Sequence, residues 1–203
     1  MESDHEYMKM IYKKFLEDKD YILKYHKYKI AVFGEYSSGK SSMLNSLIGI
    51  DLLPESNGHC TKAILIIQYT KLKKDISLYS VKKNGDDDNN SFVYFIEDKL
   101  IAQGEELVKK NLKKINNDYK GEIQYYILNT PIKFLDDFIE DEKIKEKIQF
   151  FDTPGLDSLL KEYTDINFPK LIKCINLFIY MNANNIIFQN ESESALRKRL
   201  NLY

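Results

Sequence analysis

The residues best suited to chemistry in this sequence form a short loop rich in glycine and serine. The run from Gly34 to Ser41 matches the pattern G-x-x-x-x-G-K-[ST], in which the glycines let the backbone approach a polyphosphate closely. Backbone N–H groups and the start of the following helix then face the phosphate oxygens, while Lys40 neutralises the outer phosphates and Ser41 holds Mg2+. We therefore predict a nucleoside triphosphate site that is built from Gly34, Glu35, Tyr36, Ser37, Ser38, Gly39, Lys40, Ser41 and Ser42.

A second chemical element, Asp152-Thr153-Pro154-Gly155, follows an apolar run that ends at Phe151. It matches D-x-x-G, the pattern with which GTP-hydrolysing P-loop proteins sense the terminal phosphate. At such a position Asp152 reaches Mg2+ through water, and the Gly155 N–H bonds the γ-phosphate until hydrolysis releases it. Proline and glycine are also ordinary turn residues, so this tetrapeptide gains its weight from the P-loop upstream.

Between the two motifs lies a polar loop, residues 52–63, that contains Thr61. A threonine here can lend its hydroxyl to Mg2+ and its carbonyl to the attacking water, although a loop threonine more often has no such role. The predicted metal ligands are therefore Ser41, Thr61 and Asp152.

Apolar runs around these motifs predict the strands that position them, at residues 30–33, 64–67, 76–81, 92–95, 125–128, 148–151 and 175–181. An Asn84-Gly85 turn between two of these runs predicts a hairpin with a solvated acidic tip. Two helices are also predicted, one over residues 1–27 and one over 98–116 with Leu100, Ile101, Leu107, Val108 and Leu112 on its apolar face. The first helix either packs on its own domain or serves as a neck or stalk element.

The composition indicates a globular protein without the large positive net charge that is typical of nucleic-acid-binding proteins. The 203 residues are 43% hydrophobic, enough for one domain, and 30 Lys and Arg oppose 31 Asp and Glu. Two cysteines are too few for a disulfide framework, and the acidic start lacks the pattern of a signal peptide. We therefore expect a cytoplasmic protein that does not bind nucleic acid.

Taken together, the runs K-I-A-V-F-G-E-Y-S-S-G-K-S-S-M-L-N-S-L-I-G-I-D-L-L-P, C-T-K-A and F-F-D-T-P-G-L-D-S resemble the dynamin superfamily, most closely its bacterial dynamin-like GTPases. The resemblance covers about residues 28–203, which we take as a dynamin-type GTPase domain. It implies an α/β P-loop NTPase fold of the Ras-like kind. The expected sheet is mostly parallel with helices on both faces, and the N-terminal helix precedes it.

The resemblance also implies Mg2+-dependent binding and hydrolysis of GTP to GDP, coupled to dimerisation through the nucleotide face and to membrane remodelling. By analogy the catalytic residues are Ser37, Lys40, Thr61 and Gly155, and Asp152 and Gly155 join the nucleotide-binding set. Tyr36 departs from the glutamine of eukaryotic dynamins, and no arginine lies near the P-loop. Stimulation is therefore expected from a monovalent cation such as K+, from dimerisation, or not at all. Membrane association, peripheral at the inner membrane, is expected through regions absent from this chain.

The sequence lacks the N/T-K-x-D motif with which GTPases read guanine. We expect a GTPase domain that is incomplete at its C-terminal end, as in a partial chain. Two alternatives stay open at this point. One is a non-catalytic nucleotide-binding or assembly module, and the other is an ATPase, because the phosphate-side residues are indifferent to the base.

Overall fold

The computed structural model describes residues 27–34, 37–54, 63–83, 95–117, 124–154 and 175–181. The strands in these ranges are β1 (Tyr28–Gly34), β2 (Ala63–Tyr69), β3 (Ser77–Lys83), β4 (Phe95–Gln103), β5 (Gln124–Thr130), β6 (Ile148–Asp152) and β7 (Leu177–Met181). The helices are α2 (Lys40–Ile48), α3 (Glu105–Asn117), α4 (Lys133–Phe138) and α5 (Glu142–Lys145), with a short 3-10 turn at Lys73–Asp75. The predicted strands at 30–33, 64–67, 125–128, 148–151 and 175–181 are thus confirmed.

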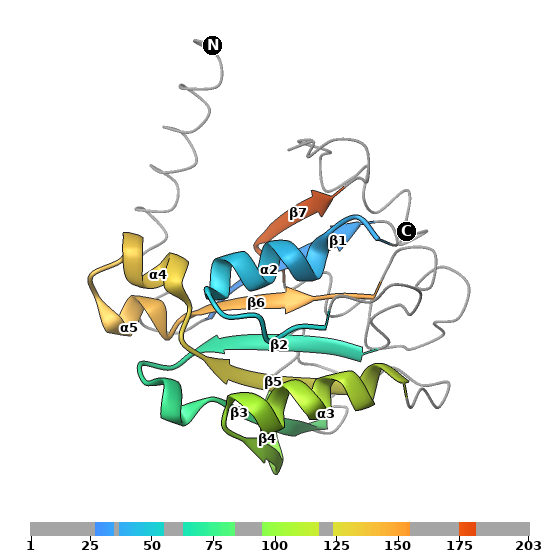
Figure 1. Ribbon diagram of the computed structural model, residues 1–203. Coiled ribbons are helices and arrows are strands. Elements are labelled where there is room, and N and C mark those ends of the chain that lie inside the picture. The colour runs from blue at the N-terminus through green and yellow to red at the C-terminus, as the bar shows by residue number, and fades with distance from the viewer. Residues whose placement is uncertain are drawn as a thin grey trace.

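The strands form one 7-stranded sheet in the order β4-β3-β5-β2-β6-β1-β7 (Figure 1). The pairs β1–β6, β1–β7 and β2–β5 are parallel, whereas β2–β6, β3–β5 and β3–β4 are antiparallel. The prediction of a mostly parallel sheet was therefore wrong, and the sheet is mixed. An apolar run buried on both faces looks the same in either direction, so it does not fix the direction of a strand.

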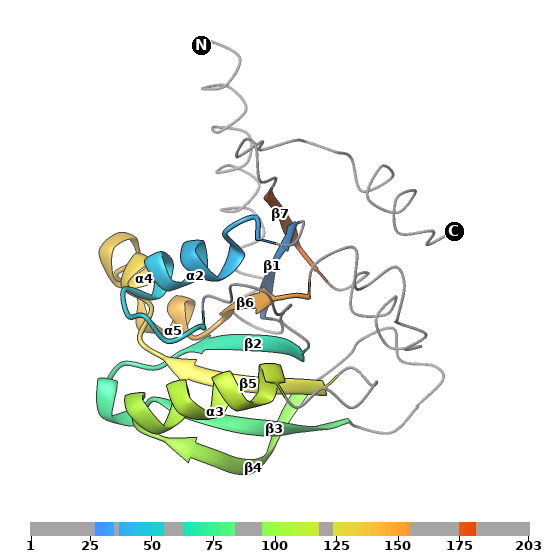
Figure 2. The same cartoon turned by 45° about the vertical axis from the view of Figure 1, so that its right-hand side comes forward.

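The described helices pack against one face of the sheet, as the two views in Figures 1 and 2 show for α2 and α3. The core on that face joins buried residues of α2, α3 and α4 to the strands, with Val32, Leu44, Val108, Leu128 and Leu135 among its members. A second buried cluster on the other face is formed by strand residues, including Phe33, Ile66 and Phe151. The prediction of helices on that second face is not tested by the described residues.

The segment between β3 and α3 differs in part from its prediction. β3 and β4 run antiparallel, as in the predicted hairpin, but β4 spans Phe95–Gln103 and not 92–95, of which only Phe95 is described. The helix predicted over 98–116 begins at Glu105 instead, since residues 98–103 pair with β3 and Gly104, at φ +88°, separates the strand from the helix. Leu107 is also 56% exposed, whereas Val108 and Leu112 are buried as predicted.

Some predictions lie outside the described residues. These are residues 1–26 of the helix predicted over 1–27, the acidic tip at 84–90, and the site residues Glu35, Tyr36, Thr61 and Gly155. Within the described ranges, no helix is long and apolar enough to cross a membrane.

Candidate functional site

The carboxyl ends of β1 and β6 bring the two sequence motifs to the same edge of the sheet. The strands are parallel neighbours, and Val32 is paired in register with Asp152. The chain leaves β1 at Gly34 and enters α2 at Lys40, so the P-loop spans the space above this edge. Ends of parallel strands at which a helix begins are common ligand sites in α/β proteins.

Gly34 is required by the close approach of β7. A Cβ atom at this position would lie 2.2 Å from the carbonyl oxygen of Met181 and 2.6 Å from Oγ of Ser38. The first contact is with backbone, which cannot move aside without shifting the paired strand. The first glycine of the pattern therefore has a packing reason that is visible in the structure.

The backbone of the loop takes the left-handed conformation at two points. Ser37 has φ 56° and Gly39 has φ 86°, and Gly39 is the N-cap residue that directly precedes α2. The Met43 N–H donates to the carbonyl oxygen of Gly39 at 2.9 Å. The first turn of any α-helix presents N–H groups that have no acceptor earlier in the helix. Such N–H groups, at the positive end of the helix dipole, suit an anion.

Lys40 is buried and folds back over the loop. Its Nζ donates a hydrogen bond to the carbonyl oxygen of Gly34 at 3.0 Å. The ammonium group is therefore held beside the carboxyl end of β1, and its charge acts on the nearby Asp152 carboxyl group.

Asp152 is 3% exposed at the end of β6. Its Oδ1 accepts no hydrogen bond from the part of the chain that the structure describes. Burial raises the pKa of Asp152 to about 7, while the charge of Lys40 acts in the opposite direction. A buried carboxylate without a hydrogen-bond donor is costly, and an added cation would remove that cost.

Ser41 and Asp152 line the same small cavity, of about 20 Å³. Its other walls come from the segment after α2, from β2, β5 and α3, through Leu53, Pro54, Ala63, Leu65, Leu112, Ile115, Asn116 and Tyr126. A hydroxyl and an orphaned carboxylate are the oxygen donors that Mg2+ prefers, so these residues fit that ion. Among the described residues no group of three or more His, Cys, Asp or Glu could hold a metal by itself.

The structure thus brings together Gly34, Ser38, Gly39, Lys40, Ser41 and Asp152 from the predicted set. Ser37 and Ser42 are described but exposed to solvent. The remaining predicted residues, Glu35, Tyr36, Thr61 and Gly155, lie outside the described ranges.

Two residues of this region were not singled out in the sequence. Thr153 is fully buried, and its Oγ1 donates to the carbonyl oxygen of Val32 at 2.8 Å, which ties the D-x-x-G segment to β1. Asn45 is a buried amide on α2 that bonds the chain after the helix. A polar residue within the apolar run M-L-N-S-L-I was a signal for Asn45, whereas nothing in the sequence pointed to the bond of Thr153.

Comparison with known proteins agrees with this geometry. A family model described as "Dynamin family" matches residues 30–201. Dynamin-like protein A of Bacillus subtilis is 29% identical over 225 aligned positions, which cover 87% of this chain and 18% of that protein. Dynamin-like protein 1 of Campylobacter jejuni is 26% identical over 194 positions, which cover 86% of this chain and 25% of that protein. The chain therefore spans a quarter or less of the length of these relatives.

A solved structure is also similar to the chain. It is described as "An oligomerised bacterial dynamin pair provides a mechanism for the long range sensing and tethering of membranes". The match has a TM-score of 0.39 and 22% identity, and it covers 82% of this chain and 22% of that one. Overlap at this TM-score is too small to carry a structural argument.

Proposed function

Because this chain belongs to the dynamin family, we propose that it binds GTP with Mg2+ and hydrolyses the nucleotide to GDP. The observation that carries the proposal is the Asp152 carboxyl group, which is buried beside Ser41 and acted on by the Lys40 charge, and whose Oδ1 atom accepts no hydrogen bond from the described residues. Buried carboxylate oxygens normally have a hydrogen-bond partner. An oxygen without such a partner, at the end of a strand and next to a phosphate-binding loop, supports a role in holding a cation.

In this proposal the chain's own residues bind and orient the triphosphate. The N–H groups of the P-loop and of the first turn of α2 donate to its oxygens, and Lys40 binds the outer phosphates. Ser41 and, through water, Asp152 hold Mg2+, with Thr61 as a further predicted ligand. The bound ion supplies positive charge where negative charge develops on the phosphates.

The remaining roles rest on the family. We propose that Ser37 helps to place the attacking water and a monovalent cation, and that the Gly155 N–H senses the γ-phosphate. GTP would drive dimerisation across the nucleotide face. We further propose that the whole protein is cytoplasmic, associates with the inner membrane and remodels it through regions that this chain does not span.

Turnover with and without Lys40 tests the enzymatic part. Release of phosphate from GTP and Mg2+ is measured for the wild-type chain, for Lys40→Ala, and for Lys71→Ala, which removes an exposed ion pair with Glu142 remote from the P-loop. We expect Lys40→Ala to lose at least about 100-fold in rate and Lys71→Ala to match the wild type. A folded wild-type chain that takes up no triphosphate would contradict the proposal.

Two further measurements separate the alternatives. Binding of GTP without Lys40-dependent phosphate release would favour a non-catalytic nucleotide-binding module. Competition of GTP and ATP for a fluorescent analogue decides between a GTPase and an ATPase, and we expect GTP to compete more strongly.

A further inference from the structure

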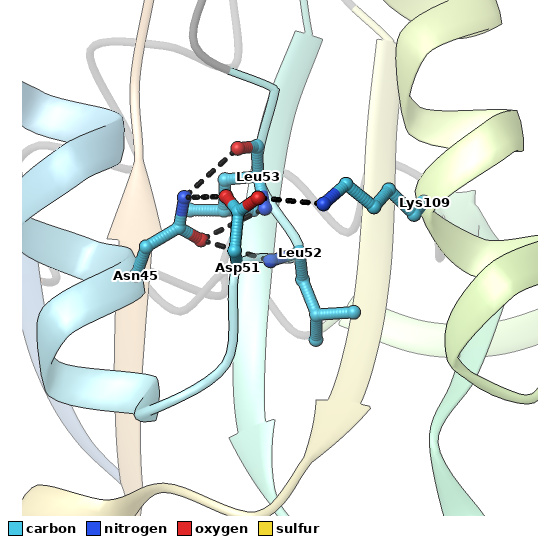
Figure 3. A network of polar contacts seen from close by, with 5 residues as sticks. All are labelled: Asn45, Asp51, Leu52, Leu53 and Lys109. Carbon is cyan, nitrogen blue, oxygen red and sulfur yellow. Dashed lines mark hydrogen bonds and ion pairs between the residues drawn. The ribbon is translucent and has the colours of Figure 1, made fainter.

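A polar network is centred on Asn45 of α2 (Figure 3). Asn45 follows Ser41 by about one turn of α2, so the two side chains lie on the same side of the helix. The Oδ1 atom of Asn45 accepts hydrogen bonds from the N–H groups of Leu52 at 3.1 Å and Leu53 at 2.8 Å. Its Nδ2 atom donates to the carbonyl oxygen of Leu53 at 2.9 Å and to Oδ1 of Asp51 at 3.0 Å.

These bonds use the full capacity of the amide. An asparagine side chain has two acceptor lone pairs and two N–H donors, and all four are engaged here. The amide therefore fixes both the donor and the acceptor of Leu53, as two parallel hydrogen bonds fix a pair of strands. Asp and Ala at this position would each lose at least two of the four bonds.

The segment that Asn45 holds forms a wall of the cavity that contains the candidate metal ligands. Leu53 and Pro54 line that cavity together with Ser41 and Asp152. A shift of the Leu53 backbone would therefore change the space beside both oxygen donors. The cavity, of about 20 Å³, has room for about one water molecule, so a shift of this wall changes a small space.

The network also reaches α3, which supplies the opposite wall. The Oδ2 atom of Asp51 pairs with Nζ of Lys109 at 2.6 Å. Leu112, Ile115 and Asn116 of the same helix line the cavity. Asp51 and Lys109 are 68% and 30% exposed in their side chains, so this outer pair is weaker than the buried bonds of Asn45.

We propose that Asn45 is a positioning residue for the metal side of the site, and that the Asp51–Lys109 pair is its outer support. Asn45 acts through Leu53, which sets the distance between α2 and α3 around Ser41 and Asp152. The inference rests on the proposed function, because Ser41 and Asp152 hold Mg2+ only in that proposal. Loosening the network raises the Mg2+ concentration needed for hydrolysis and lowers kcat, while the fold remains intact.

The experiment measures kcat and the half-saturating Mg2+ concentration at saturating GTP, at a temperature well below the melting temperature of each variant. Removing a residue that orients a metal ligand costs about 10–100-fold in metal affinity or activity, so we expect a change of that size for Asn45→Ala. We expect about 3–10-fold for Asp51→Ala and within about 2-fold for Asp51→Asn, which keeps an acceptor for the Asn45 amide. Lys71→Ala is the control for loss of an exposed lysine ion pair.

Amide hydrogen exchange tests the network without any hydrolysis. In the nucleotide-free chain, Asn45→Ala and Asp51→Ala should speed exchange at the Leu53 N–H, and less at the Leu52 N–H, which also donates to the Ile50 carbonyl oxygen at 3.0 Å, whereas Lys71→Ala should not. If the wild type does not hydrolyse GTP, the proposed function fails, and exchange still decides whether the network holds this segment. Folded Asn45→Ala and Asp51→Ala variants with unchanged kcat and Mg2+ dependence would overturn the inference, as would unchanged exchange. Should Asn45→Ala not fold, Asp51→Ala decides by the same two criteria.

Discussion

Two aspartates lie at opposite ends of the strands of the sheet, and their surroundings shift their pKa values in opposite directions. At the carboxyl ends of β1 and β6, Asp152 is buried with Oδ1 unbonded by the described residues, and burial raises its pKa to about 7. At the other edge, Asp136 of α4 accepts from Nζ of Lys145 at 2.7 Å and from the Tyr69 hydroxyl at 2.8 Å. Burial pushes the pKa of Asp136 upward, but these two bonds outweigh it, so the pKa is lowered.

The difference separates a cluster whose charged groups bond one another from the group of residues for which we propose a ligand. The Asp136 cluster satisfies its charges internally, and the Lys145 ammonium also lies 5.3 Å from the centre of the Tyr69 ring. Around Asp152, the Oδ1 atom of this residue and the Ser38 hydroxyl have no hydrogen-bond partner among the described residues, and the backbone at Ser37 is left-handed. Unsatisfied and strained groups tend to gather where a protein binds or reacts.

The largest test of this contrast is Asp152→Asn. We expect hydrolysis to fall about 10–100-fold, because a neutral amide holds a cation poorly. We also expect the nucleotide-free protein to gain on the order of 1–3 kcal/mol at pH 8, because a buried charge without a hydrogen bond is removed. Phosphate release and denaturant unfolding measure the two effects. The matched variant Asp136→Asn should leave hydrolysis unchanged. If Asp152→Asn is less stable than the wild type at pH 8, the carboxyl group of Asp152 is stabilising, and the contrast with Asp136 is wrong.

The pH dependence of stability should have opposite signs at the two aspartates. Between pH 3.8 and about pH 7, the raised pKa of Asp152 lets the folded, nucleotide-free protein keep a proton on this carboxyl group. The unfolded chain has already released that proton in this pH range. The stability due to this group is therefore complete below 3.8 and is lost as the pH rises through about 7. The lowered pKa of Asp136 gives a contribution that is present above the ordinary value of 3.8 and is lost at lower pH.

The measurement is the free energy of unfolding from about pH 5 to about pH 8 for the wild type and Asp152→Asn. Over this range the advantage of the variant should grow by on the order of 1–3 kcal/mol. An advantage that does not change with pH would show that Asp152 is ionised throughout, with a partner that the described residues do not include.

The sequence predicted best those features that depend on local backbone rules. The P-loop pattern placed Gly34 and Gly39 correctly because a close strand and a left-handed φ allow little else there. Strand direction could not be predicted, since β2 is equally apolar whether it runs with or against β6. Leu100 and Ile101 fitted a helical spacing, but pairing with β3 drew them into a strand.

The parts of the site that escaped prediction depend on contacts between distant segments. Thr153 bonds the carbonyl oxygen of Val32, 121 positions away in sequence, and no spacing rule announces such a bond. Asn45 is buried because the chain turns back after α2 and presents its backbone to the amide. The roles of all the predicted site residues stay predictions, and Glu35, Tyr36, Thr61 and Gly155 also lie outside the described ranges.

A smaller effect is expected at the structural edge. Asp136→Ala removes both bonds of the cluster and leaves Lys145 without its carboxylate. Because the Asp136 side chain is 41% exposed, solvent screens part of this loss. We expect the melting temperature to fall by about 2–4 °C. Hydrolysis per folded molecule should not change. The adjacent variant Asp137→Ala, which removes only an exposed pair with Lys133, should have almost no effect on either measurement.

The smallest effect is expected for Ser38→Ala, which tests a single buried hydroxyl group near Asp152. The Oγ atom of Ser38 is buried without a hydrogen bond to the described residues, so its removal sacrifices no contact of the nucleotide-free protein. The free energy of unfolding should therefore change by less than about 0.5 kcal/mol, or rise slightly. Hydrolysis should fall by less than about 10-fold, because phosphate binding by such a loop depends on its backbone N–H groups and on Lys40. A loss of stability above about 1 kcal/mol would mean that the hydroxyl already has a partner, and that this edge is less open to a ligand than Asp152 indicates.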